Sequence, residues 1–172
     1  MTTANHSTST EPLTCEPATP QLLLQSAPFQ LARQLTPALS GLQFGIGGSL
    51  LLMELGLLTK ARDLDLVCSL KDFSLIAAAL GHVLTPIEVA PHPEYQSEAF
   101  ARFVATDGTE VDLMAGIRVK QHQQQCWQFR PEQVEWRHQL PWMTALDWLE
   151  LYQLFNRSER VLLLQTFLQQ RK

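Results

Sequence analysis

A glycine turn followed by two closely spaced aspartates constrains this chain more than any other stretch. Residues 44–50 read FGIGGSL, and residues 62–67 read RDLDLV. This pattern predicts a strand, a glycine turn, a helix and then a second strand. Side chains alternate between the two faces of a strand, so Asp63 and Asp65 should share one face while Leu64 points into the core. The sequence therefore predicts an α/β protein that presents two carboxylates together on a sheet.

The glycine turn and the acid pair suit different parts of one ligand. Carboxylate oxygens are the ligands that Mg²⁺ or Mn²⁺ prefers. Gly47 and Gly48 allow the backbone to approach a ligand closely. Ser49 stands where the helix should begin, and the free N–H groups and positive dipole end of a helix start favour a phosphate. Together these features predict a site for a metal-bound nucleoside triphosphate.

A third acid, Asp112, is predicted on a later strand. Residues 109–114 read TEVDLM, and the preceding TDG at 106–108 is a strong hairpin signal. A carboxylate among apolar neighbours is costly to bury unless a cation pairs with it. We therefore predict that Asp63, Asp65 and Asp112 are catalytic and metal-binding residues. Asp112 would either complete a second metal site or accept a proton from a hydroxyl group that attacks the bound triphosphate.

The order and spacing of these motifs resemble the signature of the polymerase-beta-like nucleotidyltransferase superfamily. Fifteen residues separate Gly48 from Asp63, and 47 separate Asp65 from Asp112. Residues 145–152 also resemble, more loosely, the C-terminal helices of small bacterial members, including the toxin-type and antibiotic-modifying branches. The resemblance implies a nucleotidyltransferase-like fold, a short mixed sheet flanked by helices with further C-terminal helices. It also implies transfer of a nucleoside monophosphate to a hydroxyl on a small molecule, a transfer RNA end or a protein.

The residues just before the acid pair leave the activity open. Lys60 and Arg62 are predicted to add positive charge to the triphosphate site, although solvated surface positions would look the same. Many members of the superfamily have threonine and arginine where this chain has Ala61 and Thr59. The alternative is a catalytically inactive protein of the same fold, with a binding or toxin–antitoxin-type regulatory role.

Two other nucleotide sites fit the sequence poorly. Gly45 and Gly47 begin like a dinucleotide-binding fingerprint, but Leu50 stands at the third glycine position. The acids also fall at the start of their strand, whereas a ribose-binding acid sits at a strand's end. A Walker-type phosphate loop is excluded because no Gly-Lys-Ser/Thr follows the glycines.

The chain's length and charge set the remaining expectations. Its 172 residues suit one domain over 20–172, preceded by a Thr-, Ser- and Pro-rich flexible leader over 1–19. The net charge of −4 argues against a broad nucleic-acid-binding face. No signal peptide or membrane-length apolar run is visible, and the three cysteines lack metal-ligand spacing, so we expect a reduced cytoplasmic protein.

The hydrophobic pattern predicts the elements around the site. We expect helices within 21–39, broken near Pro28, and at 49–58, 71–80, 144–155 and 159–169. Strands are expected at 42–48, 63–69, 83–89, 100–105 and 109–115, with further strands possible at 117–120 and 126–130. Residues 90–97 are expected to form a loop. The four tryptophans are expected to be core and interface aromatics rather than a base-stacking platform, and one of them could form the wall of an acceptor pocket.

Overall fold

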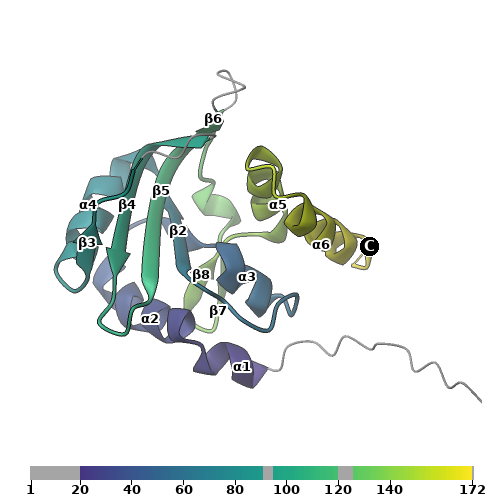
Figure 1. The fold of residues 1–172 in the computed structure, drawn as a ribbon, viewed down its shortest axis with the longest axis horizontal. Helices are drawn as coiled ribbons and strands as arrows, with labels where there is room; N and C mark the ends of the chain where they lie inside the picture. The colour runs from purple at the N-terminus through teal and green to yellow at the C-terminus, as the bar shows by residue number, and fades with distance from the viewer. Residues whose placement is uncertain (1–19, 91–94, 120–125, 172) are drawn as a thin grey trace, which may run out of the picture.

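The computed structural model describes residues 20–90, 95–119 and 126–171 (Figure 1). The predicted leader at 1–19 lies outside the described residues, as do residues 91–94 and the glutamine-rich stretch at 121–125.

One mixed sheet forms the centre of the described fold. Its order is β3-β4-β5-β2-β1-β8-β7, with β6 pairing beside β5. β2 runs parallel to β5 and β1 runs parallel to β8, while the other neighbours are antiparallel. The strands are β1 (Phe44–Ile46), β2 (Leu64–Cys68), β3 (Thr85–Ile87), β4 (Tyr95–Val104), β5 (Glu110–Val119), β6 (Cys126–Trp127), β7 (Glu135–Arg137) and β8 (Leu140–Trp142).

Helices flank this sheet, and the last two are the C-terminal elements of the described chain. They are α1 (Pro20–Gln25), α2 (Ala27–Leu35), α3 (Gly48–Glu54), α4 (Leu70–Gly81), α5 (Ala145–Leu154) and α6 (Ser158–Gln169), with short 3-10 turns η1 (Thr36–Leu39) and η2 (Pro131–Gln133). The predicted α/β class, a short mixed sheet flanked by helices with C-terminal helices, is confirmed.

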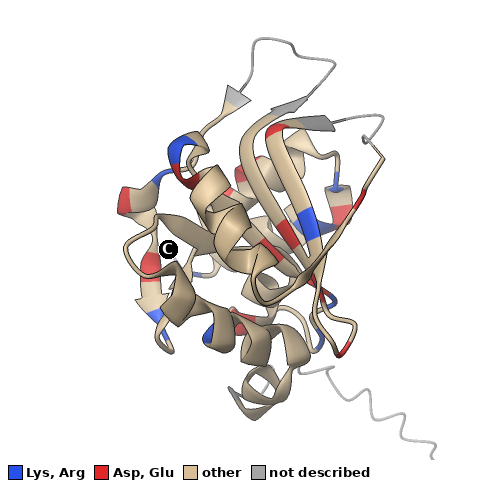
Figure 2. Cartoon of the chain, turned by 90° about the vertical axis from the view of Figure 1, so that its left-hand side faces the viewer, with Lys and Arg blue, Asp and Glu red and all other residues tan. Residues whose placement is uncertain are grey.

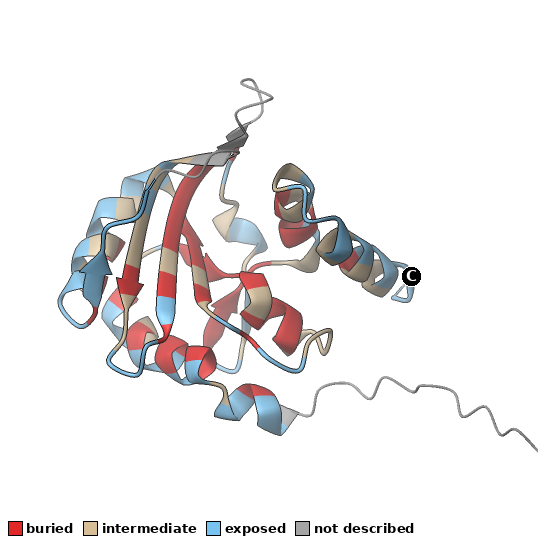
Figure 3. Ribbon diagram, viewed as in Figure 1, coloured by how far each residue is buried: buried red, intermediate tan, exposed pale blue. Residues whose placement is uncertain are grey.

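The two faces of β4 and β5 have different neighbours. α4 packs on one face through the fully buried Ile76 and Leu80, and Phe103 of β4 lies beside Gly81 at the end of α4. Because side chains alternate along a strand, Arg102 and Asp112 face the other way, toward α5 and α6. Figure 3 shows the central strands β2 and β5 largely buried and β3 exposed at the edge. Asp65 and Asp112 are thus carried by buried central strands, and Asp63 directly precedes β2.

The predicted break in the N-terminal helices lies near Pro28, at Ser26, the N-cap of α2, because Pro28 fits the first turn of a helix, where its missing N–H costs nothing. Two other predicted boundaries were wrong. Part of the predicted loop at 90–97 is the start of β4, which begins at Tyr95. Residues 117–119 continue β5 rather than forming a separate strand.

The β7–β8 hairpin was not predicted at all. Its turn consists of His138 and Gln139, which both have positive φ angles, 53° and 62°. Such turns normally contain glycine or asparagine, so His-Gln gives no turn signal. The hairpin nevertheless completes the sheet, because the fully buried Trp142 of β8 pairs with Ile46 of β1.

Two further observations concern the helices and Cys68. Within the described residues, none of the helices combines the length and the apolarity needed to cross a bilayer. Cys68 is a buried free thiol, and burial raises its pKa to about 12, so it stays protonated and unreactive at neutral pH.

Candidate active site

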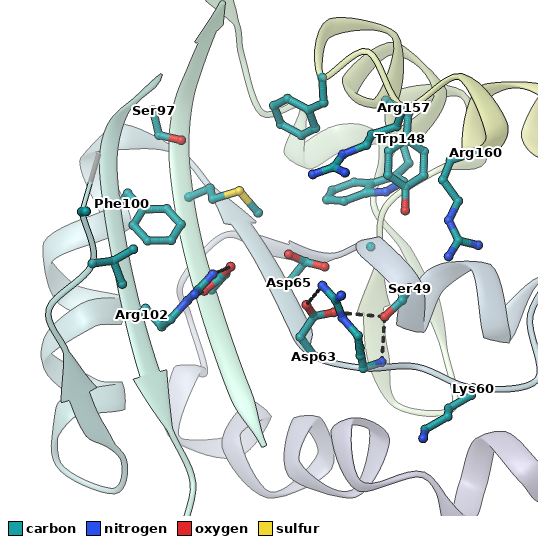
Figure 4. Close-up of a pocket in the computed structure, with 18 residues that line it drawn as sticks. Ser49, Lys60, Asp63, Asp65, Ser97, Phe100, Arg102, Trp148, Arg157 and Arg160 are labelled. Carbon is teal, nitrogen blue, oxygen red and sulfur yellow. Dashed lines mark hydrogen bonds and ion pairs between the residues drawn. The ribbon is translucent and has the colours of Figure 1, made fainter. Parts of the chain in front are cut away.

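A cavity of about 950 Å³ lies between the sheet and the two C-terminal helices. Its size is within the range of pockets that hold nucleotides and comparable ligands. Strands β2, β4 and β5, the glycine turn and helices α5 and α6 all contribute to its walls (Figure 4). The lining residues discussed below are Gly48, Ser49, Lys60, Arg62, Asp63, Asp65, Phe100, Arg102, Asp112, Trp148, Tyr152, Phe155, Arg157 and Arg160.

The sheet brings the three predicted acids together. Asp65 on β2 lies directly opposite Asp112 on the parallel strand β5, and in-register side chains on neighbouring strands share a face. Asp63, two residues before Asp65, lies on the same side, and Figure 4 shows both carboxylates directed into the cavity. Their juxtaposition therefore follows from the register of β2 against β5.

The glycine turn fits between Asp65 and an aromatic ring. A Cβ atom on Gly48, whose φ is +64°, would lie 1.7 Å from Asp65 Oδ2. A Cβ atom on Gly47 would lie 2.2 Å from the Trp148 ring. The Gly47 N–H donates to the backbone carbonyl of Asp65 at 3.0 Å. Both glycines are required because the turn is pressed against its neighbours on two sides.

Ser49 ties the glycine turn to the acid pair. Its hydroxyl donates to Asp63 Oδ1 at 3.1 Å and accepts from the backbone N–H of Arg62, also at 3.1 Å. Sequence reasoning assigned this serine to phosphate binding. In the structure its hydroxyl orients Asp63, and a role of Ser49 in phosphate binding stays a prediction.

Among the described residues, no group donates a hydrogen bond to the carboxylate of Asp65. Burial raises its pKa well above the usual value, and the neighbouring charges of Asp63 and Asp112 raise it further, while Arg102 and Arg62 act in the opposite direction. Such a carboxylate gains from a cation placed beside it. Together with Asp63 it forms a donor set of hard oxygens that fits a divalent metal ion.

Asp112 is already paired. Arg102, its cross-strand neighbour on β4, donates from Nε to Oδ1 at 2.6 Å and from a terminal nitrogen to Oδ2 at 2.7 Å. These hydrogen bonds raise the pKa of Arg102 still further, so the guanidinium is always charged. In the part of the chain that the structure describes, no group of three or more His, Cys, Asp or Glu side chains has the arrangement of a ready metal site.

The cavity is positively charged although the protein is acidic. Among the described residues, five cationic and three acidic side chains line it, whereas the whole chain has a net charge of −4. Figure 2 shows basic and acidic positions beside each other on neighbouring sheet strands. A cavity with excess positive charge favours an anionic ligand.

The five cationic side chains come from the segment before β2, from strand β4 and from the start of α6. Lys60 and Arg62 line the cavity, and the Arg62 side chain is 87% exposed at its edge. Arg157, the N-cap of α6, extends toward the space above Asp65, and Arg160, in the first turn of α6, extends on the side of Ser49 (Figure 4). Sequence reasoning missed Arg102, Arg157 and Arg160. The sole local signal was the placement of Arg102 opposite an acid in a predicted hairpin.

Aromatic side chains form the wall of the cavity that faces the sheet. Trp148 and Tyr152, one turn apart on α5, pack edge to face with their ring centroids 5.7 Å apart. Burial raises the pKa of Tyr152 to about 12, so its hydroxyl stays protonated. Phe155 completes this wall, and Phe100 faces the cavity from β4. The prediction that one tryptophan walls the pocket fits Trp148, and flat apolar surfaces of this kind suit a nucleobase.

Comparisons with known proteins support the fold. No protein-family model matches this sequence, and no curated protein matches it. Among solved structures, the chain is similar to the crystal structure of a proposed nucleotidyltransferase from Thermotoga maritima, with a TM-score of 0.62 and 16% sequence identity. The match covers 85% of this chain and 96% of that one. At this identity the likeness shows a nucleotidyltransferase-like fold.

Proposed function

We propose that this chain is a metal-dependent nucleotidyltransferase that moves a nucleoside monophosphate from a nucleoside triphosphate to a hydroxyl acceptor. The observation that carries the proposal is the alignment of Asp65 with Asp112 beside the glycine turn, in a cavity with excess positive charge. An uncharged or cationic ligand would leave that charge unbalanced. A triphosphate with one bound metal ion balances it.

Each part of the cavity has a role in this scheme. Asp63 and Asp65 would hold a magnesium ion, which supplies Lewis-acid stabilisation of charge on the phosphoryl oxygens. The acceptor hydroxyl oxygen would attack the α-phosphorus and give up its proton to water, while the bond from the α-phosphorus to the α–β bridging oxygen breaks and pyrophosphate leaves. The surrounding cations position the phosphates, and positioning with charge neutralisation provides most of the catalysis in phosphoryl transfer.

A binding-only protein is the second candidate. The pairing of Asp112 with Arg102 favours it, because a carboxylate held at both oxygens is poorly placed to act as a base. Such a protein would bind the triphosphate and leave it intact. A role in a toxin–antitoxin pair or another regulatory system belongs to this candidate.

The two candidates differ in one measurable product. The protein is incubated with Mg²⁺ and with each of the four nucleoside triphosphates, labelled at the α-phosphate, in the presence of a cell extract. Transfer predicts a labelled acceptor and released pyrophosphate, and both should disappear in a variant carrying Asp63→Ala and Asp65→Ala. Triphosphate binding without pyrophosphate from any acceptor pool would support the second candidate instead.

Replacing Arg160 with glutamine is expected to weaken triphosphate binding about tenfold or more. A charge-assisted hydrogen bond to a phosphate is worth roughly 1.5–3 kcal/mol, and 1.4 kcal/mol corresponds to tenfold in affinity. Arg171→Gln is the matched control, because Arg171 lies beyond the other end of the same helix and stacks on Phe167. Calorimetric titration at constant salt measures both. Equal affinity for the two variants would exclude Arg160 from the phosphate site.

A further inference from the structure

We propose that Arg102 takes the place of a second divalent cation, so that the cavity holds one metal ion per chain. This inference rests on the proposed function, since it concerns the same bound triphosphate. It departs from the prediction that Asp112 helps to hold a second metal. Arg102 then acts as a fixed positive charge of the site, and Asp63 and Asp65 remain as the metal ligands.

The first argument is that one guanidinium holds both oxygens of Asp112 at 2.6 and 2.7 Å. Asp63 is held more weakly, by the Ser49 hydroxyl at 3.1 Å and by the 87% exposed Arg62 at 3.4 Å, so a metal ion can replace these partners more easily. Each accepts a hydrogen bond from Arg102, and the fork of the guanidinium matches the carboxylate in the bidentate geometry. A metal ion at Asp112 would displace these bonds. It would also lie next to a guanidinium that cannot lose its proton, and two like charges at such a distance repel strongly in a partly buried site.

The second argument is that the pair is fixed by the sheet. Arg102 and Asp112 face each other across β4 and β5, so their backbones cannot separate without breaking the ladder. The side chain of Asp112 is 13% exposed and that of Arg102 is 30% exposed. Separating a pair this deeply placed would leave an uncompensated carboxylate. Glu110 at 3.6 Å and the Phe100 ring at 5.9 Å hold the guanidinium from its other sides.

The third argument is that Arg102 keeps donors for a substrate. A guanidinium has five N–H donors, and the bonds to Asp112 use two of them. Arg102 also lines the cavity, so the N–H groups that Asp112 and Glu110 do not use are available to a phosphate in this scheme. A second metal ion would supply positive charge at the same wall. The arginine supplies it permanently.

Counting bound Mn²⁺ by electron paramagnetic resonance tests the proposal. The full chain, with a saturating triphosphate analogue whose α–β bridge is a methylene group, is titrated with Mn²⁺ until its metal sites are filled. The wild-type chain is expected to hold one Mn²⁺ with an uncoupled spectrum. Arg102→Gln frees Asp112 and is expected to hold two Mn²⁺ ions with the broadened spectrum of a coupled pair. Arg102→Lys keeps a cation and should remain at one.

Each outcome decides the question. Two coupled ions in the wild-type chain would overturn the inference and leave the proposed function standing. One ion in Arg102→Gln would overturn it too, because Arg102 would not be what excludes the second metal. If the wild-type chain binds neither Mn²⁺ nor the analogue, the proposed function fails and the inference fails with it. The wild-type count is decisive even if the glutamine variant does not fold.

Discussion

Replacing Asp65 with asparagine is expected to slow nucleotidyl transfer by about 1,000-fold or more. Losing one carboxylate ligand removes several kcal/mol of charge stabilisation in the transition state, and each 1.36 kcal/mol is a factor of ten in rate. Glu132→Gln, an exposed charge-neutralising change on η2, is the control and should have no effect on the rate. Release of pyrophosphate with a defined acceptor, or the labelled product in extract, provides the measurement.

The same substitution is expected to stabilise the metal-free protein at neutral pH. Burial, Asp63 and Asp112 raise the pKa of Asp65 when the chain folds, so the folded state binds this proton more tightly than the unfolded state. The free energy of unfolding therefore falls as the pH rises from about 3.9, the unfolded value, to the raised folded value. Asparagine has no proton to lose. We expect a gain of about 0.5–2 kcal/mol at pH 7, a common size for relief of strain at an active site, and none below pH 4.

Thermal unfolding in EDTA across this pH range checks the stability prediction. Saturating Mg²⁺ should reduce the difference in stability between the variant and the wild type. The bound cation stabilises the wild-type protein through its carboxylate and stabilises the asparagine variant less. A variant less stable than the wild type at pH 7 without metal would show that the Asp65 charge is satisfied by the fold. Asp65 would then not be a residue that requires a bound cation.

Gly48→Ala is expected to destabilise the fold by about 3 kcal/mol or more. The left-handed backbone costs an alanine roughly 1–2 kcal/mol, and overpacking costs roughly 1–3 kcal/mol more. The clash arises because the new Cβ would lie 1.7 Å from Asp65 Oδ2. Triphosphate binding should fail as well, because Asp65 must move to make room.

Gly108→Ala is the matched control for this prediction. Gly108 also has a left-handed φ, +87°, but a Cβ there would meet nothing within 4 Å. It should lose only the backbone cost, and it should keep triphosphate binding. Denaturant unfolding of both variants measures the difference. Equal destabilisation would mean that the turn does not press on Asp65 in solution.

The acids and the glycine turn could be predicted because their signals are local. The alternation of Asp63, Leu64 and Asp65 fixes which face each side chain takes, and Gly47 and Gly48 mark a turn by their composition. A hairpin signal just before Asp112 placed that acid on a strand. The register of Asp65 against Asp112 then follows from burying the apolar neighbours of each on the same side.

Three of the five cations, and which aromatic residues form the wall, could not be predicted in this way. Arg157, Arg160 and Trp148 reach the cavity because α5 and α6 fold back over the sheet, and long-range packing of this kind has no local signature. The pairing of Arg102 with Asp112 depends on the register of a hairpin. The β7–β8 hairpin was missed because His138 and Gln139 adopt positive φ angles without the usual turn residues.

Triphosphate binding measured with and without Mg²⁺ is the most direct test of a metal-nucleotide site in this cavity. The account predicts that the wild-type chain binds a non-hydrolysable triphosphate in calorimetric titration with Mg²⁺ and much more weakly in EDTA. The chain carrying Asp63→Ala and Asp65→Ala should show weak binding in both buffers. Binding that depends on Mg²⁺ to the same extent in the wild-type and the doubly substituted chain would contradict the account.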